Sequence, residues 1–565
     1  MKFPIHMNKS SILIAALIAG ISASAQNFNK EITIERQFNP TLRAATRLGT
    51  SPVLRQPKFD IEPLRFSDIV IAAETGAAID TLPAASPMAA ITRSPYRGYA
   101  AIGYFPVYNL GAAAGYRIID KAATSLGVWT QFNGSSYNGD FGGDDGNELK
   151  FNRNTITAGA DFTTIINRAG RLDISADFTY DNLREPWSPD SDTRRYSATL
   201  FNVDAHWSAR STTMAYYVSA DYHNFSFNRS SLSLPTQHDY NLQGGTAYFF
   251  TDRLQLAGSI GMDFLSTSNY ILPLDQSSLA AIGSKTLGLI NFDPSFRYNS
   301  DMMRLKIGLR IQFMSHMQKS INVAPDITFT ITPSSAFTAF ATVTGAKRMN
   351  TLAGLWEWCP YINPSMAYEA SNVPLDANIG FTVGPFAGFS ATLSGGYAMA
   401  NDWLMPDYLL DIPIEGLQSG IPDPVVLSPV NLRAFHGKLT LAYSHSPLLG
   451  VEASCAFAPG SETSAWYMNR DRAKLVVNVK AESRPVDRLT VNASFSLRHS
   501  RSAYPSGVEM NLGDLNSLDL GADYAFTDAF SVFAKVENIL NSRAQLAPGI
   551  PAQGIHGAIG AAVKF

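Results

Sequence analysis

From about Tyr96 to the last residue, apolar and polar side chains alternate with a period of two, often over about ten residues at a stretch. Residues 172–181, LDISADFTYD, and residues 303–313, MRLKIGLRIQF, are two examples. Alternate side chains of a strand point to opposite faces of a sheet, and tilted strands of about ten residues cross a bilayer. Strands of soluble sandwiches are usually nearer five or six residues. The pattern therefore predicts an all-β fold, a transmembrane antiparallel β-barrel.

Short and long connections alternate along this region. The longest are expected at about residues 134–148, 346–374 and 402–430. Short periplasmic turns and longer extracellular loops are characteristic of outer-membrane barrels. Ten short turns, with both termini in the periplasm, predict a barrel of about 22 strands over residues 96–565, with 18 to 24 strands as alternatives. A barrel of this width needs a plug or a filled lumen.

The first 25 residues are organised like a signal peptide. Lys2 and Lys9 give the first residues a positive charge. Residues 12–21 then form a short apolar core, and residues 23–25, ASA, form a small-x-small cleavage site. Cleavage after Ala25 leaves Gln26 as the first mature residue. Residues 26–95 contain seven prolines and are expected to form an extended periplasmic segment with one short helix at 41–48. The expected location is the cell outer membrane.

Composition argues against several classes of protein. Charged residues make up 16% of the chain, the pI is about 6.3, and no basic block is present, so nucleic acid is not an expected partner. The two cysteines, Cys359 and Cys455, are expected to be unpaired, the second on a lipid-facing side of a strand. The chain has no G-x-S-x-G, H-E-x-x-H or P-loop motif, so we expect neither an enzyme nor a cofactor or metal.

Two groups of residues are candidates for a functional role, each with a simpler alternative. Arg304, Lys306 and Arg310 share the lumen face of one strand and could attract an anion, or could pair with lumen carboxylates. The aromatic cluster of the 346–374 loop could stack on a flat ligand, or could pack that loop into the barrel mouth. The expected partners of the cations are Asp173, Asp177, Asp519 and Asp523, and the loop aromatics are Trp356, Trp358 and Tyr361.

A third candidate is the loop at residues 140–146, DFGGDDG. Its carboxylates and glycines could hold Ca²⁺, but it lacks the spacing of an EF-hand. An ordinary outer loop is the alternative.

Both ends of the predicted barrel carry distinctive sequences. Near the C-terminus, Asn538-Ile539-Leu540-Asn541 is followed by Gly549-Ile550-Pro551, and the two resemble motifs that precede the last strand of TonB-dependent receptors. The final strand ends at Phe565, as in the assembly signal of outer-membrane barrels. The first hairpin, residues 97–117, is also similar, and residues 31–48 resemble the leader of some Bacteroidota receptor-like proteins.

The resemblance implies an outer-membrane transport protein, a receptor-like barrel or pore for a solute. Only about 70 residues lie between the cleavage site and the first strand, so the family's plug domain is expected to be missing. The implied partners are outer-membrane lipid, the barrel-assembly machinery, and either TonB or a separate plugging or surface protein. Residues 31–35 could form the segment that binds TonB, or could belong to an ordered arm along the periplasmic rim or to a contact with another protein. The alternative is a structural or interaction barrel, a scaffold in an outer-membrane complex.

Overall fold

In the computed structural model the chain divides into two compact units, residues 1–76 and 77–565, and every described residue lies in the second. The predicted signal peptide, the cleavage site at Ala25 and Gln26, and the predicted extension up to residue 94 lie outside the described residues. The structure describes residues 95–105, 108–140, 148–166, 170–184, 195–229, 232–271, 282–315, 321–358, 369–407, 426–446, 448–458, 473–503, 510–547 and 550–565.

Twenty-two strands form a single antiparallel sheet. They are β1 (Gly98–Phe105), β2 (Asn109–Asp120), β3 (Thr124–Asp140), β4 (Glu148–Ile166), β5 (Gly170–Arg184), β6 (Arg195–Arg210), β7 (Met214–Arg229), β8 (Leu232–Phe249), β9 (Leu254–Ile271), β10 (Ile282–Asn299), β11 (Met303–Met314), β12 (Ile321–Ser334), β13 (Phe337–Arg348), β14 (Ser371–Phe386), β15 (Phe389–Asp407), β16 (Val426–Ser446), β17 (Leu449–Phe457), β18 (Leu475–Val486), β19 (Leu489–His499), β22 (Leu515–Ala525), β23 (Phe530–Glu537) and β26 (His556–Lys564).

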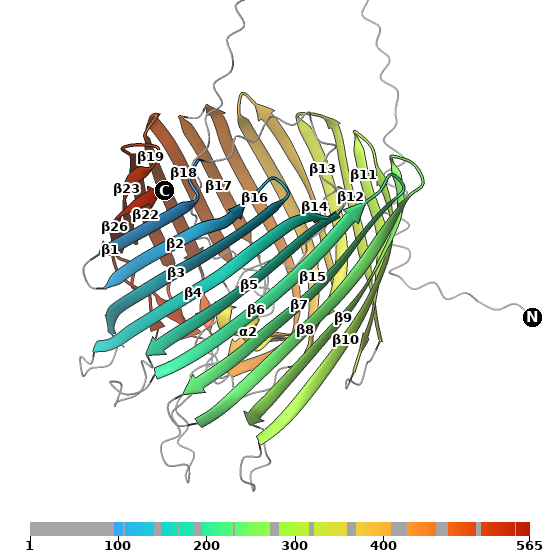
Figure 1. Cartoon of the computed structure of the whole chain (residues 1–565), viewed down its shortest axis with the longest axis horizontal. Helices are drawn as coiled ribbons and strands as arrows, with labels where there is room; N and C mark the ends of the chain where they lie inside the picture. Colours follow the sequence, from blue (N-terminus) through green and yellow to red (C-terminus); the bar gives the residue numbers. More distant parts are fainter. Residues whose placement is uncertain are drawn as a thin grey trace, which may run out of the picture. The chain divides into compact units, whose positions relative to one another are not determined.

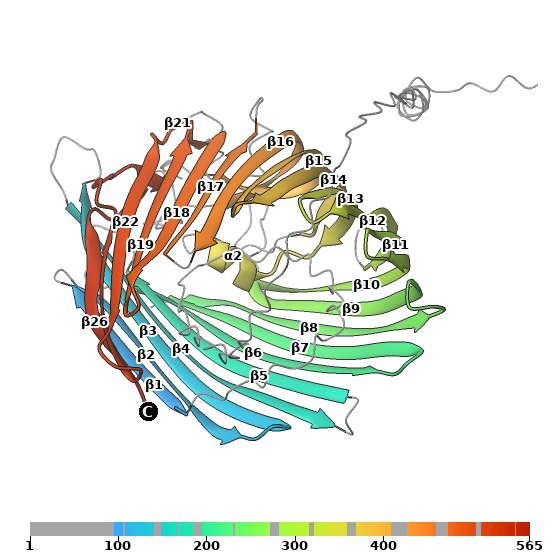
Figure 2. The same ribbon diagram turned by 90° about the horizontal axis from the view of Figure 1, so that it is seen from above.

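Each strand of the sheet pairs with its neighbours in the chain, and β1 pairs with β26, so the sheet closes on itself (Figures 1 and 2). The backbone of Phe565 completes the closure, because its carbonyl accepts from the amides of Arg97 (2.8 Å) and Gly98 (2.7 Å). Closure leaves no strand with an unpaired edge, which is the requirement for a sheet in lipid. The prediction of a 22-strand antiparallel barrel is confirmed.

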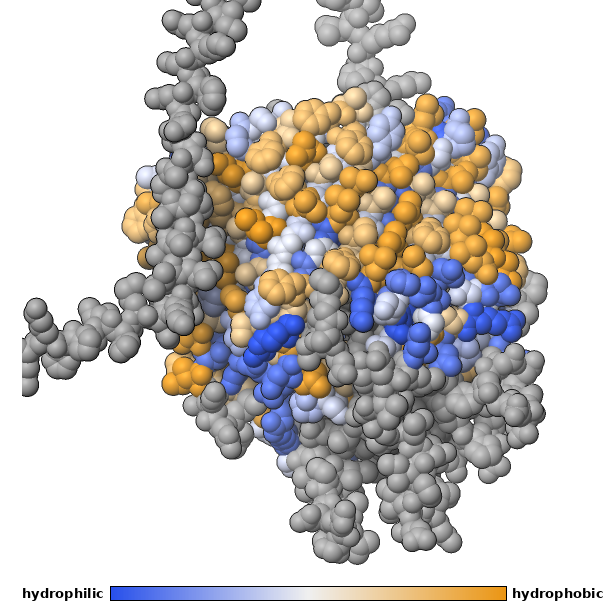
Figure 3. All heavy atoms as spheres, turned by 180° about the vertical axis from the view of Figure 1, so that it is seen from behind, coloured by the Kyte–Doolittle hydropathy of each residue, from blue (hydrophilic) through white to orange (hydrophobic). Residues whose placement is uncertain are grey.

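The outer face of the barrel carries the apolar residues of the alternating pattern. Figure 3 shows apolar side chains over most of one face, with a polar band between them and the ends of the strands that lead to the long loops. On β11 the outward residues Ile307 and Leu309 are exposed, while Gln312, on the other parity, is buried. Other exposed apolar residues are Ile102, Phe178, Ile260, Ile379, Phe435 and Ile559. This is the lipid-facing band expected of such a barrel.

Ten short connections join strands at the end where Phe565 lies. The opposite end has the longer connections, together with short ones after β1 and β7 (Figure 1). We call these the periplasmic and extracellular ends. The predicted long loop at about residues 402–430 is shorter than expected, because strands continue into it: β15 runs to Asp407 and β16 begins at Val426. Strand pairing beyond the predicted boundaries extends the wall on the extracellular side.

The extracellular connections contain one short helix and two short pairs of strands. A helix, α2 (Leu352–Trp358), follows β13, the pair β20 (Ser502–Ala503) and β21 (Met510–Asn511) follows β19, and the pair β24 (Gln545–Ala547) and β25 (Ile550–Pro551) follows β23. Viewed from above, α2 lies inside the ring of strands (Figure 2). The largest cluster of buried apolar residues surrounds this helix.

Two smaller observations complete the fold. Among the described residues, no helix is long and apolar enough to cross a membrane. Cys455, on β17, is a free cysteine with the outward parity of Phe457, and Cys359 lies outside the described residues.

Candidate functional site

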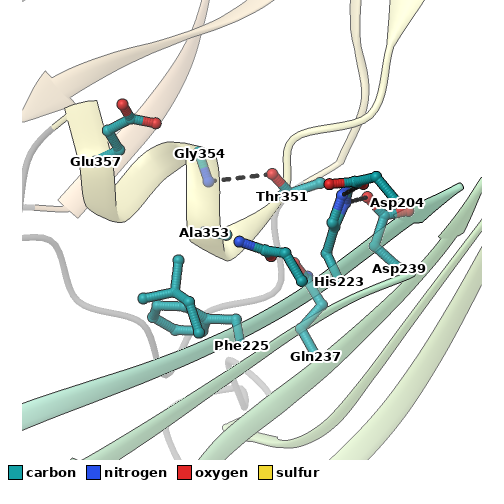
Figure 4. Close-up of a pocket in the computed structure, with 11 residues that line it drawn as sticks. Asp204, His223, Phe225, Gln237, Asp239, Thr351, Ala353, Gly354 and Glu357 are labelled. Atoms are coloured by element: carbon teal, nitrogen blue, oxygen red, sulfur yellow. Dashed lines mark hydrogen bonds and ion pairs between the residues drawn. The ribbon is translucent and has the colours of Figure 1, made fainter. Parts of the chain in front are cut away.

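A pocket of about 210 Å³ lies between α2 and the inner face of β6–β8 (Figure 4). The barrel wall contributes five polar or charged side chains in cross-strand positions, and the α2 segment contributes a second wall. The lining residues are Leu200, Asn202, Asp204, His223, Phe225, Gln237, Asp239, Thr351, Ala353, Gly354 and Glu357. The pocket is therefore a polar chamber at the extracellular end of the lumen, covered by a segment that enters from a loop.

An imidazole between two carboxylates marks the wall side of the pocket. His223 Nε2 lies 2.9 Å from Asp204 Oδ1, and His223 Nδ1 lies 3.6 Å from Asp239 Oδ2. The three side chains come together because β6, β7 and β8 are consecutive and His223 stands opposite Asp239 in the register. Glu357 adds a carboxylate from α2. Such a wall, rich in acceptors, can bind groups that donate hydrogen bonds.

The other side of α2 is apolar and packs into a core. Leu352, Leu355 and Trp356 are each less than 10% exposed. The Trp356 ring lies 5.3 Å from the Phe227 ring and 6.1 Å from the Phe225 ring, measured between centroids. The same core contains Phe151, Leu183, Tyr196 and Ala198 from β4–β6, Leu404 and Leu427 from β15 and β16, and Leu512. Apolar packing thus joins α2 to strands from separate parts of the barrel wall.

Two polar contacts fix α2 on the wall. Trp356 Nε1 donates to Asp181 Oδ2 (3.0 Å), and Asp181, which is 2% exposed, also accepts from Arg153 Nη2 (2.7 Å) and Thr155 Oγ1 (2.9 Å). The amide of Leu352 donates to Gln237 Oε1 (2.6 Å), and Gln237 Nε2 donates to Thr267 Oγ1 (2.8 Å). Both acceptors on the wall are themselves held in place by neighbouring strands, so the helix docks onto a preorganised surface.

The predicted aromatic cluster is only partly described. Trp356 packs in the core under the mouth and is 3% exposed, which is the arrangement expected if the loop packs into the barrel. The side chain of Trp358 and all of Tyr361 lie outside the described residues, so a ligand role for the cluster stays a prediction.

The predicted stripe of cations lies on β11. Lys306 and Arg310 form ion pairs there, but with strand neighbours rather than with the four aspartates named from the sequence: Lys306 Nζ lies 2.6 Å from Asp326 Oδ2, and Arg310 Nε lies 3.2 Å from Asp293 Oδ1. Arg304 is exposed nearer the periplasmic end. Partners on β10 and β12 are favoured because residues in adjacent strands lie within side-chain reach.

The four named aspartates have other partners. Asp173 pairs with Arg171 on its own strand (2.8 Å), and Asp177 accepts from Asn202 Nδ2 (3.0 Å). Asp519 accepts from Ser494, Ser517 and the backbone of Asn538. Asp523 is exposed on β22, opposite Phe533 of β23. The structure therefore does not gather these aspartates around the cations of β11.

Asp140 ends β3, and residues 141–147 of the candidate calcium loop lie outside the described residues. Among the residues that the structure describes, no group of three or more His, Cys, Asp or Glu side chains could hold a metal ion.

The C-terminal motif forms the turn that leads out of β23. Asn538 and Asn541 have φ values of 51° and 50°, in the left-handed region that asparagine tolerates better than most residues. Asn538 Nδ2 donates to the carbonyls of Ser542 (2.9 Å) and Gln553 (2.6 Å), and its Oδ1 accepts from the Ser542 amide (3.0 Å). The motif thus holds the last long connection in shape.

Phe565 occupies the outer edge of the closure and stacks on Tyr116, with ring centroids 6.4 Å apart. Its ring also covers Gly98, where an added Cβ would lie 2.4 Å from a ring carbon. A role in assembly stays a prediction, and the structure gives the residue a second task, which is to close the barrel.

Sequence reasoning missed Asp204, His223, Asp239, Gln237 and the role of Asp181. Their alternation on inward-facing positions was visible, but nothing in one strand tells which residue of the next strand stands opposite. The register supplies that information.

Comparisons with known proteins concern the fold. No protein-family model matches the chain, and no curated protein matches it. Among solved structures, the siderophore receptor PirA from Acinetobacter baumannii matches with a TM-score of 0.62 and 10% identity, over 83% of this chain and 80% of that chain. PirA from Pseudomonas aeruginosa matches with a TM-score of 0.58 and 14% identity, over 84% and 81%.

A variant of the ferric enterobactin receptor from Pseudomonas aeruginosa matches with a TM-score of 0.60 and 11% identity, over 83% of this chain and 80% of that chain. At such low identity these matches concern architecture alone. The chain has the fold of outer-membrane receptor barrels.

Proposed function

We propose that this chain is an outer-membrane transport protein, a receptor-like barrel that takes a solute from the extracellular side. The observation that carries the proposal is the closed 22-strand barrel, which shares its fold with receptors for siderophores over more than 80% of the chain. Function does not follow from fold alone, so the inner surface must support it. That surface is polar and charged, as a path for a solute requires.

The extracellular mouth is where a solute would first make contact. The pocket under α2 offers Asp204, His223, Asp239 and Glu357, together with side-chain amides. Ligand sites commonly combine a concave shape with a few convergent polar groups. A solute that donates hydrogen bonds fits this chemistry. Further along the lumen, the ion pairs of β11 with β10 and β12 line the wall.

The remaining expectations belong to the same proposal. Residues 1–25 direct export, the apolar band contacts outer-membrane lipid, and the barrel-assembly machinery receives the last strand with Phe565. Residues 31–35 would contact TonB, unless a separate plugging or surface protein takes that place. The absence of a plug domain and the origin of the chain in a Bacteroidota organism are part of the hypothesis.

A second candidate function is a scaffold barrel in an outer-membrane complex. Two observations favour it: α2 is folded into the mouth within an apolar core, and the lumen cations Lys306 and Arg310 are paired. A barrel that serves only as a scaffold needs no path through its lumen.

Conductance in planar bilayers separates the two functions. The mature protein is measured beside a variant that lacks residues 26–95, with heat-modifiable migration as the check that both are folded. Steady conductance in either protein supports transport, and conductance only in the shortened one identifies the extension as the block. Silence from both, with folded barrels, contradicts a simple pore and favours the scaffold.

A further inference from the structure

Residues 349–358, which we call the mouth segment, comprise three residues after β13 and the helix α2. The base of the segment is anchored near β14, since Asn350 Nδ2 donates to Ser371 Oγ (3.0 Å) and Met349 packs on the cluster around Leu265 and Leu287. Its far part reaches β5 and β7 on the barrel wall. The segment therefore extends from its own strands into the lumen (Figure 2).

The helix depends on the wall for its stability. It has seven residues, and isolated helices shorter than about 12 residues are marginal in water. Its apolar side is buried, but Thr351 and Gly354 line the pocket rather than packed protein (Figure 4). A short element that packs on one side only can leave its place without disrupting the strands that hold the barrel.

One side chain of the helix combines apolar packing with a hydrogen bond to the wall. Trp356 supplies both the largest ring in the core and the hydrogen bond to Asp181 (3.0 Å). Arg153 and Thr155 of β4 also donate hydrogen bonds to Asp181. These bonds do not involve Trp356, so we expect the acceptor to stay in place whether or not Trp356 is present. The acceptor, Asp181, is fixed, whereas the Trp356 ring can leave. A contact with one fixed and one releasable partner can act as a latch.

We propose that the mouth segment is a gate that is closed in this structure, with Trp356 as the latch and Asp181 as its receptacle. The movement of the segment does not depend on the proposed transport function, but the use of such a gate does. Release of Trp356 opens the core that joins α2 to β4–β7, β15 and β16, and with it the extracellular mouth. Rearrangement of a loop between two packed states is a recognised form of switching.

The test reads the position of the gate without relying on transport. A cysteine probe, Leu355→Cys, is placed in the full mature chain with Cys359→Ser and Cys455→Ser, and the barrel is presented in lipid vesicles to a bulky water-soluble maleimide. Leu355 is 8% exposed in the closed arrangement, so labelling is expected to be slow. Trp356→Ala should accelerate labelling at least tenfold.

Two further variants make the test specific. Trp356→Phe keeps an apolar ring but has no N–H to donate, so its labelling rate should fall between those of the parent and Trp356→Ala. Leu432→Ala truncates an equally buried side chain in a cluster that does not contain the mouth segment, and should leave labelling unchanged. Rapid labelling in the parent, or no acceleration in either Trp356 variant, overturns the gate.

Conductance of the same proteins separates this inference from the proposed function. Faster labelling accompanied by higher conductance in Trp356→Ala supports both. Faster labelling with no conductance, in the full chain and in the chain without residues 26–95, leaves the gate standing and contradicts transport. Conductance without any change in labelling contradicts the gate and leaves transport standing.

Discussion

The barrel wall has two regions that differ in height. The strands β3–β10, the long wall, are 15 to 19 residues long, whereas β23, β26 and β1, the seam, have 8, 9 and 8 residues. About ten tilted residues cross a bilayer, so the strands of the seam are at or just below the length that spans the membrane. The long wall continues past that depth, and its added residues pack α2.

The difference shows which part of the sequence serves which purpose. On the long wall, inward residues near the extracellular end are large and apolar, such as Phe225 and Phe227, and make a core with the mouth segment. At the seam two of the residue pairs between β1 and β26 are small on both strands, Gly103 opposite Gly560 and Ala101 opposite Ala562. The long wall builds the candidate site, and the seam closes the barrel by close approach of two backbones.

The largest expected effect tests the close approach at the seam. A Cβ added to Gly560 would lie 2.2 Å from the carbonyl oxygen of Ile102, whereas one added to Gly127 on the long wall would meet no atom within 4 Å. Gly560→Ala should therefore lower the free energy of unfolding by about 3 kcal/mol or more, because overpacking forces backbone shifts. Gly127→Ala should be nearly neutral. Denaturant unfolding in lipid vesicles measures both, and equal effects would contradict a tight seam.

The next effect concerns the extracellular end of the long wall. Asp181→Asn removes the charge from a carboxylate that is 2% exposed and accepts from Arg153, Thr155 and Trp356. The expected loss is about 2 kcal/mol, since hydrogen bonds to buried charged groups contribute about 1.5–3 kcal/mol each. The matched change Asp173→Asn, in a pair that is exposed at the other end of β5, should cost less than about 1 kcal/mol.

Equal losses from the two aspartate variants in unfolding experiments would remove the distinction between the receptacle of the latch and an ordinary exposed pair.

A smaller effect belongs to the turn beside the seam. Asn538→Ala removes three side-chain hydrogen bonds and places a less tolerant residue at a φ of 51°. We expect a loss of about 1–2 kcal/mol in the free energy of unfolding, with the turn as the cause. Asn541→Gly, which suits the φ of 50° but loses one acceptor, should cost about half as much. A reversed order of the two variants in unfolding experiments would contradict this assignment.

The smallest effect lies outside the membrane, at the extracellular end of β19. The hydrogen bond from His499 Nδ1 to Asp514 Oδ2 (2.7 Å) lowers the pKa of the Asp514 carboxyl below its ordinary value. A lowered pKa in the folded state stabilises the protein above the ordinary value, and this contribution disappears as pH falls through the folded value. Because the pair is exposed, Asp514→Asn should cost only a few tenths of a kcal/mol, about 0.3 kcal/mol.

The difference between Asp514→Asn and the parent should vanish in strong acid, when unfolding is followed against pH. If the difference in free energy of unfolding between the two proteins grew as pH fell, it would contradict the lowered pKa of Asp514.

Much of the barrel could be predicted from the sequence, because alternation reports directly on the two faces of each strand. The strand count, the ten short turns and the outward parity of residues such as Ile307 all follow from local pattern. The lengths of β15 and β16 could not be predicted, since loop-like composition around residues 402–430 concealed their continuing pairs. Pairing beyond the membrane depends on the neighbouring strand rather than on local composition.

The candidate site was harder to predict for the same reason. The shared face of Lys306 and Arg310 follows from their spacing, but their partners Asp326 and Asp293 depend on the register of β11 with its neighbours. The pocket needs in addition a segment that enters from a loop, and the contact of Trp356 with Asp181 joins residues far apart in the chain. Such long-range contacts leave no periodic signal in a single sequence.

The closure at Phe565 has a consequence for the order of assembly. Its carbonyl accepts from Arg97 and Gly98, at the start of the first strand, so the bond that completes the ring joins the two ends of the barrel. Contacts of such sequence separation form slowly, because the intervening chain must be ordered first. Until β26 pairs with β1, the sheet keeps two unpaired strand edges, and such edges are sites where chains can aggregate. The final hydrogen bonds at Phe565 therefore also end the period in which the barrel is most exposed to wrong pairing.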